Sequence, residues 1–330
     1  MQSWSKDLSP FNEAERLLQD RVGVRDRMEK VGRRVIYDLM PDEHRSFYER
    51  LPFLVVGGID ENYWSMPSIL FGIPGFVHTP SARKMIINAR LLEEDPLHKT
   101  LNEGDPIGVL GIQPITRRRN RMNGVVEERS NAAFSIKTVQ AFGNCPQYIE
   151  ARDFKVVGNL SLPESKGSDV FESLDFDIQN MIRRSYRFFV ASQNDREDKL
   201  ASGGVDVSHR GGLPGFIKVE SNTLTIPDFR GNFAFSTLGN FSVNPSGGLL
   251  FLDDETQSIV QLWGSVELIM ELTSELKQVP GAQRGWKFRV ERGIRHKTAS
   301  PLRWATGEIG PGSERSGIWP ENMQLSKQPQ

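Results

Sequence analysis

Ile73-Pro74-Gly75-Phe76 recurs as Leu213-Pro214-Gly215-Phe216, an offset of 140 residues (213 against 73). Two further matches share this offset: Gly108-Val109-Leu110 with Gly248-Leu249-Leu250, and Gly124-Val125-Val126-Glu127 with Gly264-Ser265-Val266-Glu267. Three matches at one spacing indicate two copies of one structural unit. A fourth, Phe53-Leu54-Val55 with Phe188-Phe189-Val190, has an offset of 135 (188 against 53). It predicts five extra residues in the second copy, which we place in the polar segment 194–204, because a hairpin loop tolerates insertion.

The two copies have the same predicted order of elements. A helix-like segment, 41–50 or 175–187, runs into an apolar strand. Short runs rich in β-branched and aromatic residues follow, separated by turn residues: 76–78, 85–88, 107–112 and 122–127 in the first copy, and 216–219, 223–226, 248–252 and 259–268 in the second. Each copy ends in an alternating run, 134–139 or 288–294. Short strands at this spacing favour a closed barrel or a sandwich, so the predicted class is mainly β with flanking helices (α+β).

The repeat suggests five parts of the chain. They are an N-terminal helical segment (1–38), a first β unit (39–157), a linker (158–174), a second β unit (175–305) and a flexible tail (306–330). Residues 10–36 have helical spacing, with Ser9 as the expected N-cap and Pro10 at the first helical position. The apolar face expected to pack on the β units contains Leu17, Leu18, Val22, Met28, Val31 and Val35.

Composition excludes several classes of protein. The chain has 330 residues, with 41 lysines and arginines against 42 aspartates and glutamates, so no global field attracts it to nucleic acid or anionic lipid. No apolar run approaches the roughly 18 residues of a membrane span. The first seven residues lack a signal-peptide pattern, and a single cysteine, Cys145, suits a reducing compartment. We therefore expect a cytoplasmic protein. The five histidines show no metal-ligand spacing, so no metal site is expected.

The two copies differ where the second carries groups suited to an anion. Arg230 and Asn232 flank a glycine, and Ser236 and Thr237 lie where a helix would begin. An arginine fork, hydroxyls and helix-start amides together can hold a phosphate. The first copy has Arg90 followed by Glu93 and Glu94 in this region, which is a poor anion site. By residue type alone, a Gly-Asn turn with a solvent-facing arginine is the favoured interpretation. Ser208-His209-Arg210 is likewise either a polar hairpin end or the edge of a ligand site.

The second copy resembles a known family. The motifs are Asp206-Val207-Ser208-His209-Arg210-Gly211, Leu213-Pro214-Gly215-Phe216, Leu224-Thr225-Ile226-Pro227-Asp228, Gly231-Asn232, Ser236-Thr237-Leu238 and Asn244-Pro245-Ser246-Gly247-Gly248-Leu249-Leu250-Phe251. In order and spacing they resemble the pyridoxamine 5'-phosphate oxidase-like flavoproteins, which are FMN-binding split β-barrels. The first copy is similar more weakly, through Arg117–Gly124 and Phe142–Ile149.

The resemblance implies two tandem split β-barrels, antiparallel and Greek-key, forming a pseudo-dimer within one chain. FMN would lie in the groove between the barrels. By family position, Ser208, His209 and Arg210 would lie near the isoalloxazine, within a cofactor set that includes Asp228. Arg230, Asn232, Ser236 and Thr237 would hold the phosphate. The first barrel would contribute Arg119 and Arg121 from across the groove.

The implied function is an FMN-dependent oxidoreductase, with no catalytic residue assigned. A true pyridoxamine phosphate oxidase is not expected, because Ser236-Thr237 stands where those enzymes carry an Arg-Lys pair. Residues 301–304 also match their substrate element only loosely. The alternatives are a non-catalytic protein that binds FMN, haem, FAD or deazaflavin, and a cofactor-free interaction module. An apolar cavity beside the cofactor would favour the enzyme, and a closed face the binder.

The resemblance also bears on partners. We expect a small-molecule substrate or electron donor. In one version of the hypothesis, a separate reductase is a further partner. The chain would be a monomeric pseudo-dimer or a homodimer, with no membrane partner. The basic run Arg117-Arg118-Arg119-Asn120-Arg121 could by itself contact nucleic acid, but a neutral chain without interleaved aromatics argues against that.

Overall fold

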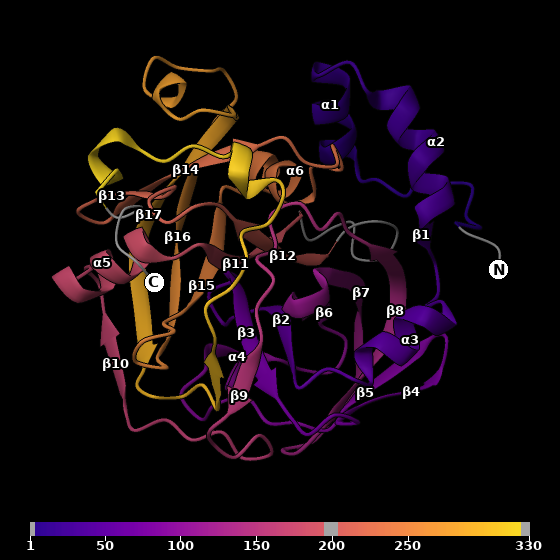
Figure 1. The fold of residues 1–330 in the computed structure, drawn as a ribbon. Coiled ribbons are helices and arrows are strands. Elements are labelled where there is room, and N and C mark those ends of the chain that lie inside the picture. Colours follow the sequence, from indigo (N-terminus) through magenta and orange to yellow (C-terminus); the bar gives the residue numbers. More distant parts are fainter. Residues whose placement is uncertain (1–3, 195–203, 325–330) are drawn as a thin grey trace.

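The computed structural model describes residues 4–194 and 204–324, and in this part of the chain it is mostly β. Two eight-stranded antiparallel sheets account for most of the strands, with a separate two-stranded sheet. Six helices accompany them: α1(Glu13–Arg21), α2(Arg25–Val35), α3(Asp42–Tyr48), α4(Pro96–Thr100), α5(Phe176–Arg184) and α6(Ser236–Val243). The predicted mainly-β class is confirmed (Figure 1).

The first sheet has the strand order β3-β2-β6-β7-β8-β5-β4, and β1 also pairs with β8. Its strands are β1(Ile36–Tyr37), β2(Phe53–Ile59), β3(Ser65–Phe71), β4(Val77–Ser81), β5(Lys84–Ile87), β6(Pro106–Gln113), β7(Arg118–Arg129) and β8(Phe134–Gly143). They include the predicted runs of the first copy, and β7 is longer than predicted because its pairing with β6 starts at Arg118.

The second sheet has the order β12-β11-β15-β16-β17-β14-β13, with β10 on β17. Its strands are β10(Ser168–Phe171), β11(Arg187–Gln193), β12(Val205–Gly211), β13(Lys218–Glu220), β14(Thr223–Phe229), β15(Ser246–Leu252), β16(Ile259–Ile269) and β17(Ala282–His296). The two orders correspond strand for strand. β10 lies inside the expected linker, so only part of 158–174 is free of sheet structure.

The register corrects one offset. Val56 on β2 is opposite Val109, and Val190 on β11 is opposite Leu249. The partners Val109 and Leu249 are 140 apart, so Val56 corresponds to Val190 at an offset of 134 (190 against 56), and not 135. Apolar triplets in a buried strand match equally well at either register, and only hydrogen-bond partners decide between them. The insertion is therefore six residues, and most of the segment assigned to it, 195–203, lies outside the described residues.

The sheets meet through a close backbone approach at two glycines. A Cβ on Gly108 would lie 2.7 Å from the Val205 carbonyl oxygen, and a Cβ on Gly248 would lie 2.5 Å from the Ser65 carbonyl oxygen. These two contacts correspond to each other at the 140-residue offset. They place β12 against β6 and, reciprocally, β3 against β15.

Buried side chains form a core for each sheet and a third between them. Trp286, Phe188 and Phe288 belong to the core of the second sheet, and Leu54 and Val56 to that of the first. Phe53 and Val55 point the other way, into a cluster shared with Phe189, Val207 and Leu250. Since successive strand residues face opposite sides, the uninterrupted apolar run of β2 is explained by burial on both faces.

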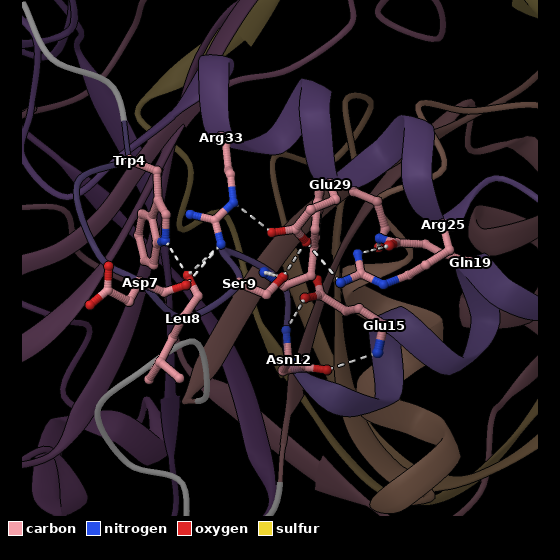
Figure 2. Close-up of polar contacts among 12 residues, drawn as sticks. Trp4, Asp7, Leu8, Ser9, Asn12, Glu15, Gln19, Arg25, Glu29 and Arg33 are labelled. Atoms are coloured by element: carbon pink, nitrogen blue, oxygen red, sulfur yellow. Dashed lines mark hydrogen bonds and ion pairs between the residues drawn. The ribbon is translucent and has the colours of Figure 1, made fainter.

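The N-terminal segment is two helices, not one. Gly23, at a φ of +71°, separates α1 from α2. The N-cap of α1 is Asn12, whose side chain accepts from the Glu15 amide while a Glu15 side-chain oxygen accepts from the Asn12 amide (Figure 2). The predicted Ser9 cap is wrong, because this reciprocal capping box satisfies two amides at once. The Ser9 hydroxyl donates instead to Glu29 at 2.6 Å.

The expected apolar face is only partly buried. Leu18 and Met28 are buried, whereas Leu17, Val31 and Val35 are 61%, 41% and 48% exposed. The break at Gly23 changes the direction of the chain, so the residues of a single continuous stripe no longer face one surface.

The C-terminal tail differs from the flexible segment expected over 306–330. Trp319 is 1% exposed, and its indole N–H donates to the Phe216 carbonyl oxygen at 3.0 Å. Asn322 donates to the carbonyl oxygens of Gly215 and Ile217. Trp319 and Asn322 therefore pack against the second unit, while Glu308 and Gly312 earlier in the tail bond to the backbone of Ala151 and Gln147 in the first. The strands β9(Phe154–Val156) and β18(Leu302–Trp304) pair with each other and join the ends of the two units. No helix in the described ranges is long and apolar enough to cross a membrane.

Candidate functional site

A pocket lies where the two sheets meet and contains all the predicted site residues except Arg230. Strand β12 supplies Ser208, His209 and Arg210, and β14 supplies Asp228. The start of α6 supplies Ser236 and Thr237, with Asn232 in the loop before it. Strand β7 of the first sheet brings Arg119 and Arg121 to the same pocket. The structure thus brings together groups separated by almost 120 residues in sequence.

Arg121 and Asp206 form the polar base of the site. The Arg121 guanidinium donates to the Ser208 hydroxyl, and the Thr237 hydroxyl donates to the same oxygen at 3.0 Å. Asp206 accepts from Asn123 at 2.8 Å and lies 4.0 Å from Arg121. Burial lowers the pKa of Arg121 although Asp206 opposes the shift. This network links β7 to β12 and α6, so the geometry of the pocket depends on both halves.

Arg119 and His209 lie side by side above that base. Arg119 Nη1 donates to the His209 carbonyl oxygen at 3.2 Å and lies 3.4 Å from His209 Nδ1. Burial and then the neighbouring cations Arg121 and Arg210 lower the pKa of Arg119 to about 9. Burial, followed by the charge of Arg119, also lowers the pKa of His209 well below its usual value. The imidazole is therefore neutral and able to accept at Nδ1.

Asp228 holds two arginines at the other wall. Arg210 donates to it at 2.5 Å, and Arg284 lies 3.7 Å away with its guanidinium 5.1 Å from the ring centre of Phe235. Arg284, which is buried, was missed in the sequence. It lies on β17, before the alternating run predicted at 288–294, and only the pairing of β17 with β14 brings it into the pocket.

The electrostatics of the site favour an anion. Four arginines line it, against Asp228 and the adjacent Asp206. The Nε atoms of Arg119, Arg121 and Arg210 are buried without a hydrogen-bond partner. In addition, α6 starts after Phe235, at a φ of +65°, with no side-chain cap, so no side chain satisfies its first-turn amides. Buried donors without partners are costly, and a bound anion would satisfy them.

Of the predicted phosphate ligands, Arg230 lies outside the pocket and Asn232 lies at its rim. Arg230 is exposed and does not line the pocket; its carbonyl oxygen accepts from the Tyr148 hydroxyl at 2.8 Å. Asn232 is at the exposed rim, where its side-chain oxygen accepts from the Ala234 amide at 3.1 Å. The Gly-Asn turn interpretation therefore fits Arg230, whereas Asn232 lines the pocket and its role as a ligand stays a prediction. Tyr148, which stacks on Phe229 at 5.9 Å, comes from the first copy and also lines the pocket.

The corresponding place in the other half is closed. At the 140-residue offset, Gln261 replaces Arg121 and Ser68 corresponds to Ser208. Gln261 donates to the Pro67 carbonyl oxygen and to Asp95, both at 2.9 Å, and the Ser68 hydroxyl donates to Asp95 at 2.7 Å. Burial raises the pKa of Asp95 to about 6. These side chains satisfy one another's hydrogen-bonding groups, and no lysine or arginine among the described residues pairs with Asp95.

A second cavity adjoins the pocket beneath α1 and α2. It shares Cys145, Asn232, Ala234 and Ser236 with the pocket, and apolar side chains dominate the rest of its lining. No group of three or more histidine, cysteine, aspartate or glutamate side chains placed to hold a metal occurs in residues 4–194 and 204–324.

No protein-family model matches the sequence, and no curated protein matches it. Solved structures show a limited likeness. A putative pyridoxamine 5'-phosphate oxidase from Lactobacillus delbrueckii is 12% identical, covering 37% of this chain and 94% of that one, with a TM-score of 0.29. An FMN-binding protein from Syntrophomonas wolfei is 10% identical, covering 36% and 81%, with a TM-score of 0.24. HutZ, the heme storage protein from Vibrio cholerae, is 12% identical, covering 38% and 94%, with a TM-score of 0.26. The structural neighbours thus include proteins described as FMN-binding and heme-storing.

Proposed function

We propose that the chain is an intrachain pseudo-dimer of two split β-barrels, residues 39–157 and 175–305, that holds one FMN between them. The matching strand orders and the reciprocal contacts of Gly108 and Gly248 support a pseudo-two-fold arrangement. The closed Gln261, Ser68 and Asp95 cluster supports a single cofactor, because a phosphate there would meet a buried carboxyl group and no arginine or lysine from the described part of the chain.

The observation that carries this proposal is the set of buried arginine Nε atoms without partners, at the uncapped start of α6. The residues present fit a phosphate-bearing planar cofactor. Arg119, Arg121, Ser236 and Thr237 would bind or orient its anionic part, and Ser208 and His209 would contact the ring edge. FMN, when bound, would supply the redox chemistry, while the protein supplies binding, orientation and electrostatics.

Within this proposal, an oxidoreductase is favoured over a passive binder. The adjoining cavity beneath α1 and α2 gives a small molecule room next to the cofactor pocket, and a carrier has no need of such room. The neutral His209 and the cationic Arg119 would keep the pocket selective for an electron-rich, anionic cofactor.

The test starts with the visible spectrum of protein purified without added cofactor, and with mass identification of whatever denaturation releases. We expect one FMN per chain, or uptake of one equivalent of added FMN. Arg119→Ala should weaken FMN binding by about 1.5–3 kcal/mol, the worth of a charge-assisted hydrogen bond. Arg230→Ala should have a smaller effect, and the exposed Arg90→Ala none.

Three results would contradict the proposal. Release of haem or a deazaflavin would replace FMN as the cofactor while keeping the site. Two FMN per chain would overturn the single-site asymmetry, that is, one cofactor site with the corresponding place in the other half closed. A colourless protein that takes up none of these cofactors would refute the cofactor function.

A further inference from the structure

The cavity beneath α1 and α2 has a volume of about 210 Å³. Its apolar wall contains Phe11, Met28, Val31, Val35, Ile36 and Phe142, and its polar lining includes Glu15, Gln140, Asp206 and Ser236. No lysine or arginine is among the described residues that line it. An engineered apolar cavity of about 150 Å³ stays dry and binds benzene, so this one has room for a single substituted aromatic ring.

The N-terminal segment that covers the cavity, with α1 and α2, is attached to both halves of the protein. The Gln140 side chain on β8 donates to the Pro10 carbonyl oxygen at 2.9 Å. On the other side, α1 packs so closely on α6 that a Cβ on Gly239 would lie 3.0 Å from the Glu15 amide nitrogen. Figure 1 shows α1 beside α6 and α2 on the side of β1 and β8. The cavity is therefore a fixed feature of the packed fold.

The cavity opens in two directions. Toward the cofactor pocket, Ser236 and Cys145 line both spaces. Toward solvent, Val31 and Val35 line the cavity although they are 41% and 48% exposed, so these two residues of α2 mark its mouth. A molecule entering there would reach the side of the cofactor pocket formed by α6 and β12.

We propose that this cavity is the substrate subsite, and that it takes a neutral molecule about the size of one substituted aromatic ring with a hydrogen-bonding group directed at Glu15. This inference rests on the proposed function, since it places the substrate of that same site. Apolar walls favour an uncharged ring, and the absence of a cation in the lining disfavours a carboxylate.

Glu15 gives the subsite its polar end. Its side chain accepts from the Asn12 amide at 2.9 Å (Figure 2). Burial, and then the charge of Asp206 on β12, raise the pKa of Glu15 to about 8, against the opposing effects of the Asn12 amide, Ser236 on α6 and Arg121 on β7. Below that pH the carboxyl group carries a proton that it can donate to a substrate oxygen.

The experiment is ¹⁹F NMR titration of the protein with 4-fluorophenol, with 4-fluorobenzoate as the charged counterpart, both with and without FMN. We expect the phenol to bind and the benzoate to bind at least tenfold more weakly. Val35→Trp should fill the mouth and weaken phenol binding at least tenfold. The matched control Leu17→Trp, on the exposed face of α1 and outside the cavity, should leave it unchanged. Val31→Trp provides a second mouth variant if Val35→Trp fails to fold.

Glu15→Gln tests the polar end. Gln at this position can keep the capping box but has no proton to lose. Wild-type affinity for the phenol should fall about tenfold from pH 7 to pH 9, as a group with a pKa of about 8 deprotonates, and the variant should show no such fall. The subsite is overturned if the phenol fails to bind, or if Val35→Trp, Val31→Trp and Leu17→Trp bind it equally. An FMN titration of the same samples separates that result from failure of the cofactor site.

Discussion

Gly108→Ala and Gly248→Ala introduce corresponding backbone clashes at the two places where the sheets approach each other most closely. The new Cβ would stand 2.7 Å from the Val205 carbonyl oxygen in one variant and 2.5 Å from the Ser65 carbonyl oxygen in the other. Because ordinary contact begins near 3.4 Å, the facing strand must retreat by about 0.7–0.9 Å, and overpacking of this kind costs about 1–3 kcal/mol. Alanine also raises the unfolding free energy by about 0.4–1 kcal/mol, because it restricts the backbone of the unfolded chain more than glycine does.

The net loss expected for each variant is about 1–2 kcal/mol of unfolding free energy. At an m-value of about 3 kcal/mol/M, the midpoint of urea unfolding falls by about 0.3–0.7 M. Gly143→Ala is the matched control, since its Cβ would meet only Asn120 at an ordinary 3.6 Å; its midpoint should stay unchanged.

FMN titration separates the two variants. Gly108→Ala displaces the start of β12, directly before Ser208 and His209, and should weaken FMN binding about tenfold, which corresponds to 1.4 kcal/mol. Gly248→Ala displaces the start of β3, which carries no pocket residue, and should leave FMN affinity intact. Equal loss of affinity in both variants would refute the single-site asymmetry. Unchanged urea midpoints in both would refute the close packing of the two sheets.

Two further predictions concern stability. Trp319→Ala should lower the unfolding free energy by about 3–5 kcal/mol, the usual cost of removing a buried aromatic side chain. The control Ile309→Ala, at a residue that is 50% exposed, should cost under about 0.5 kcal/mol. If urea unfolding shows equally small effects for both variants, Trp319 does not pack on the protein. Burial lowers the pKa of His296 to about 4 in the folded protein, whereas in the unfolded chain it is near 6.5. Below pH 6.5 the unfolded chain therefore binds a proton that the folded protein does not bind until about pH 4, and the unfolding free energy falls as the pH falls through this range. Relative to His296→Gln, the wild type should therefore lose about 2 kcal/mol between pH 7 and pH 5, and a constant difference between them would contradict the assignment.

Much of the fold could be predicted from local pattern. The Pro-Gly-Phe repeat and the alternation of apolar residues predicted two corresponding sets of strands, because turn chemistry and side-chain period are properties of short segments. The register of the strands was harder to predict. The offset of 135 was wrong by one residue, since a strand buried on both faces gives no polar residue to mark its phase, and only the pairing of Val56 with Val109 and of Val190 with Leu249 fixes it.

The candidate site divides in the same way. Ser208, His209, Ser236 and Thr237 could be found because they lie in short motifs, and Arg119 and Arg121 because the family resemblance pairs them with those motifs. The sequence did not indicate that Arg284 lines the pocket, because a strand arginine looks the same whether it faces solvent or a carboxylate. The sequence placed Arg230 in the pocket, but its side chain is exposed, because the turn of the loop after β14 determines where it points and not the glycine beside it.

The sequence by itself therefore determined the strand-rich class, the two corresponding sets of strands and the half that carries the polar motifs, all of which depend on residues close together in the chain. The tertiary structure decided what depends on distant residues: the reciprocal packing at Gly108 and Gly248, the closed cluster around Gln261, and the burial of Trp319. It also decided the placement of Glu15 over the cavity, because the break at Gly23 and the packing of α1 on Gly239 determine where that carboxyl group lies. Burial, charge and unpaired donors are properties of the assembled chain, and they give this site its chemistry.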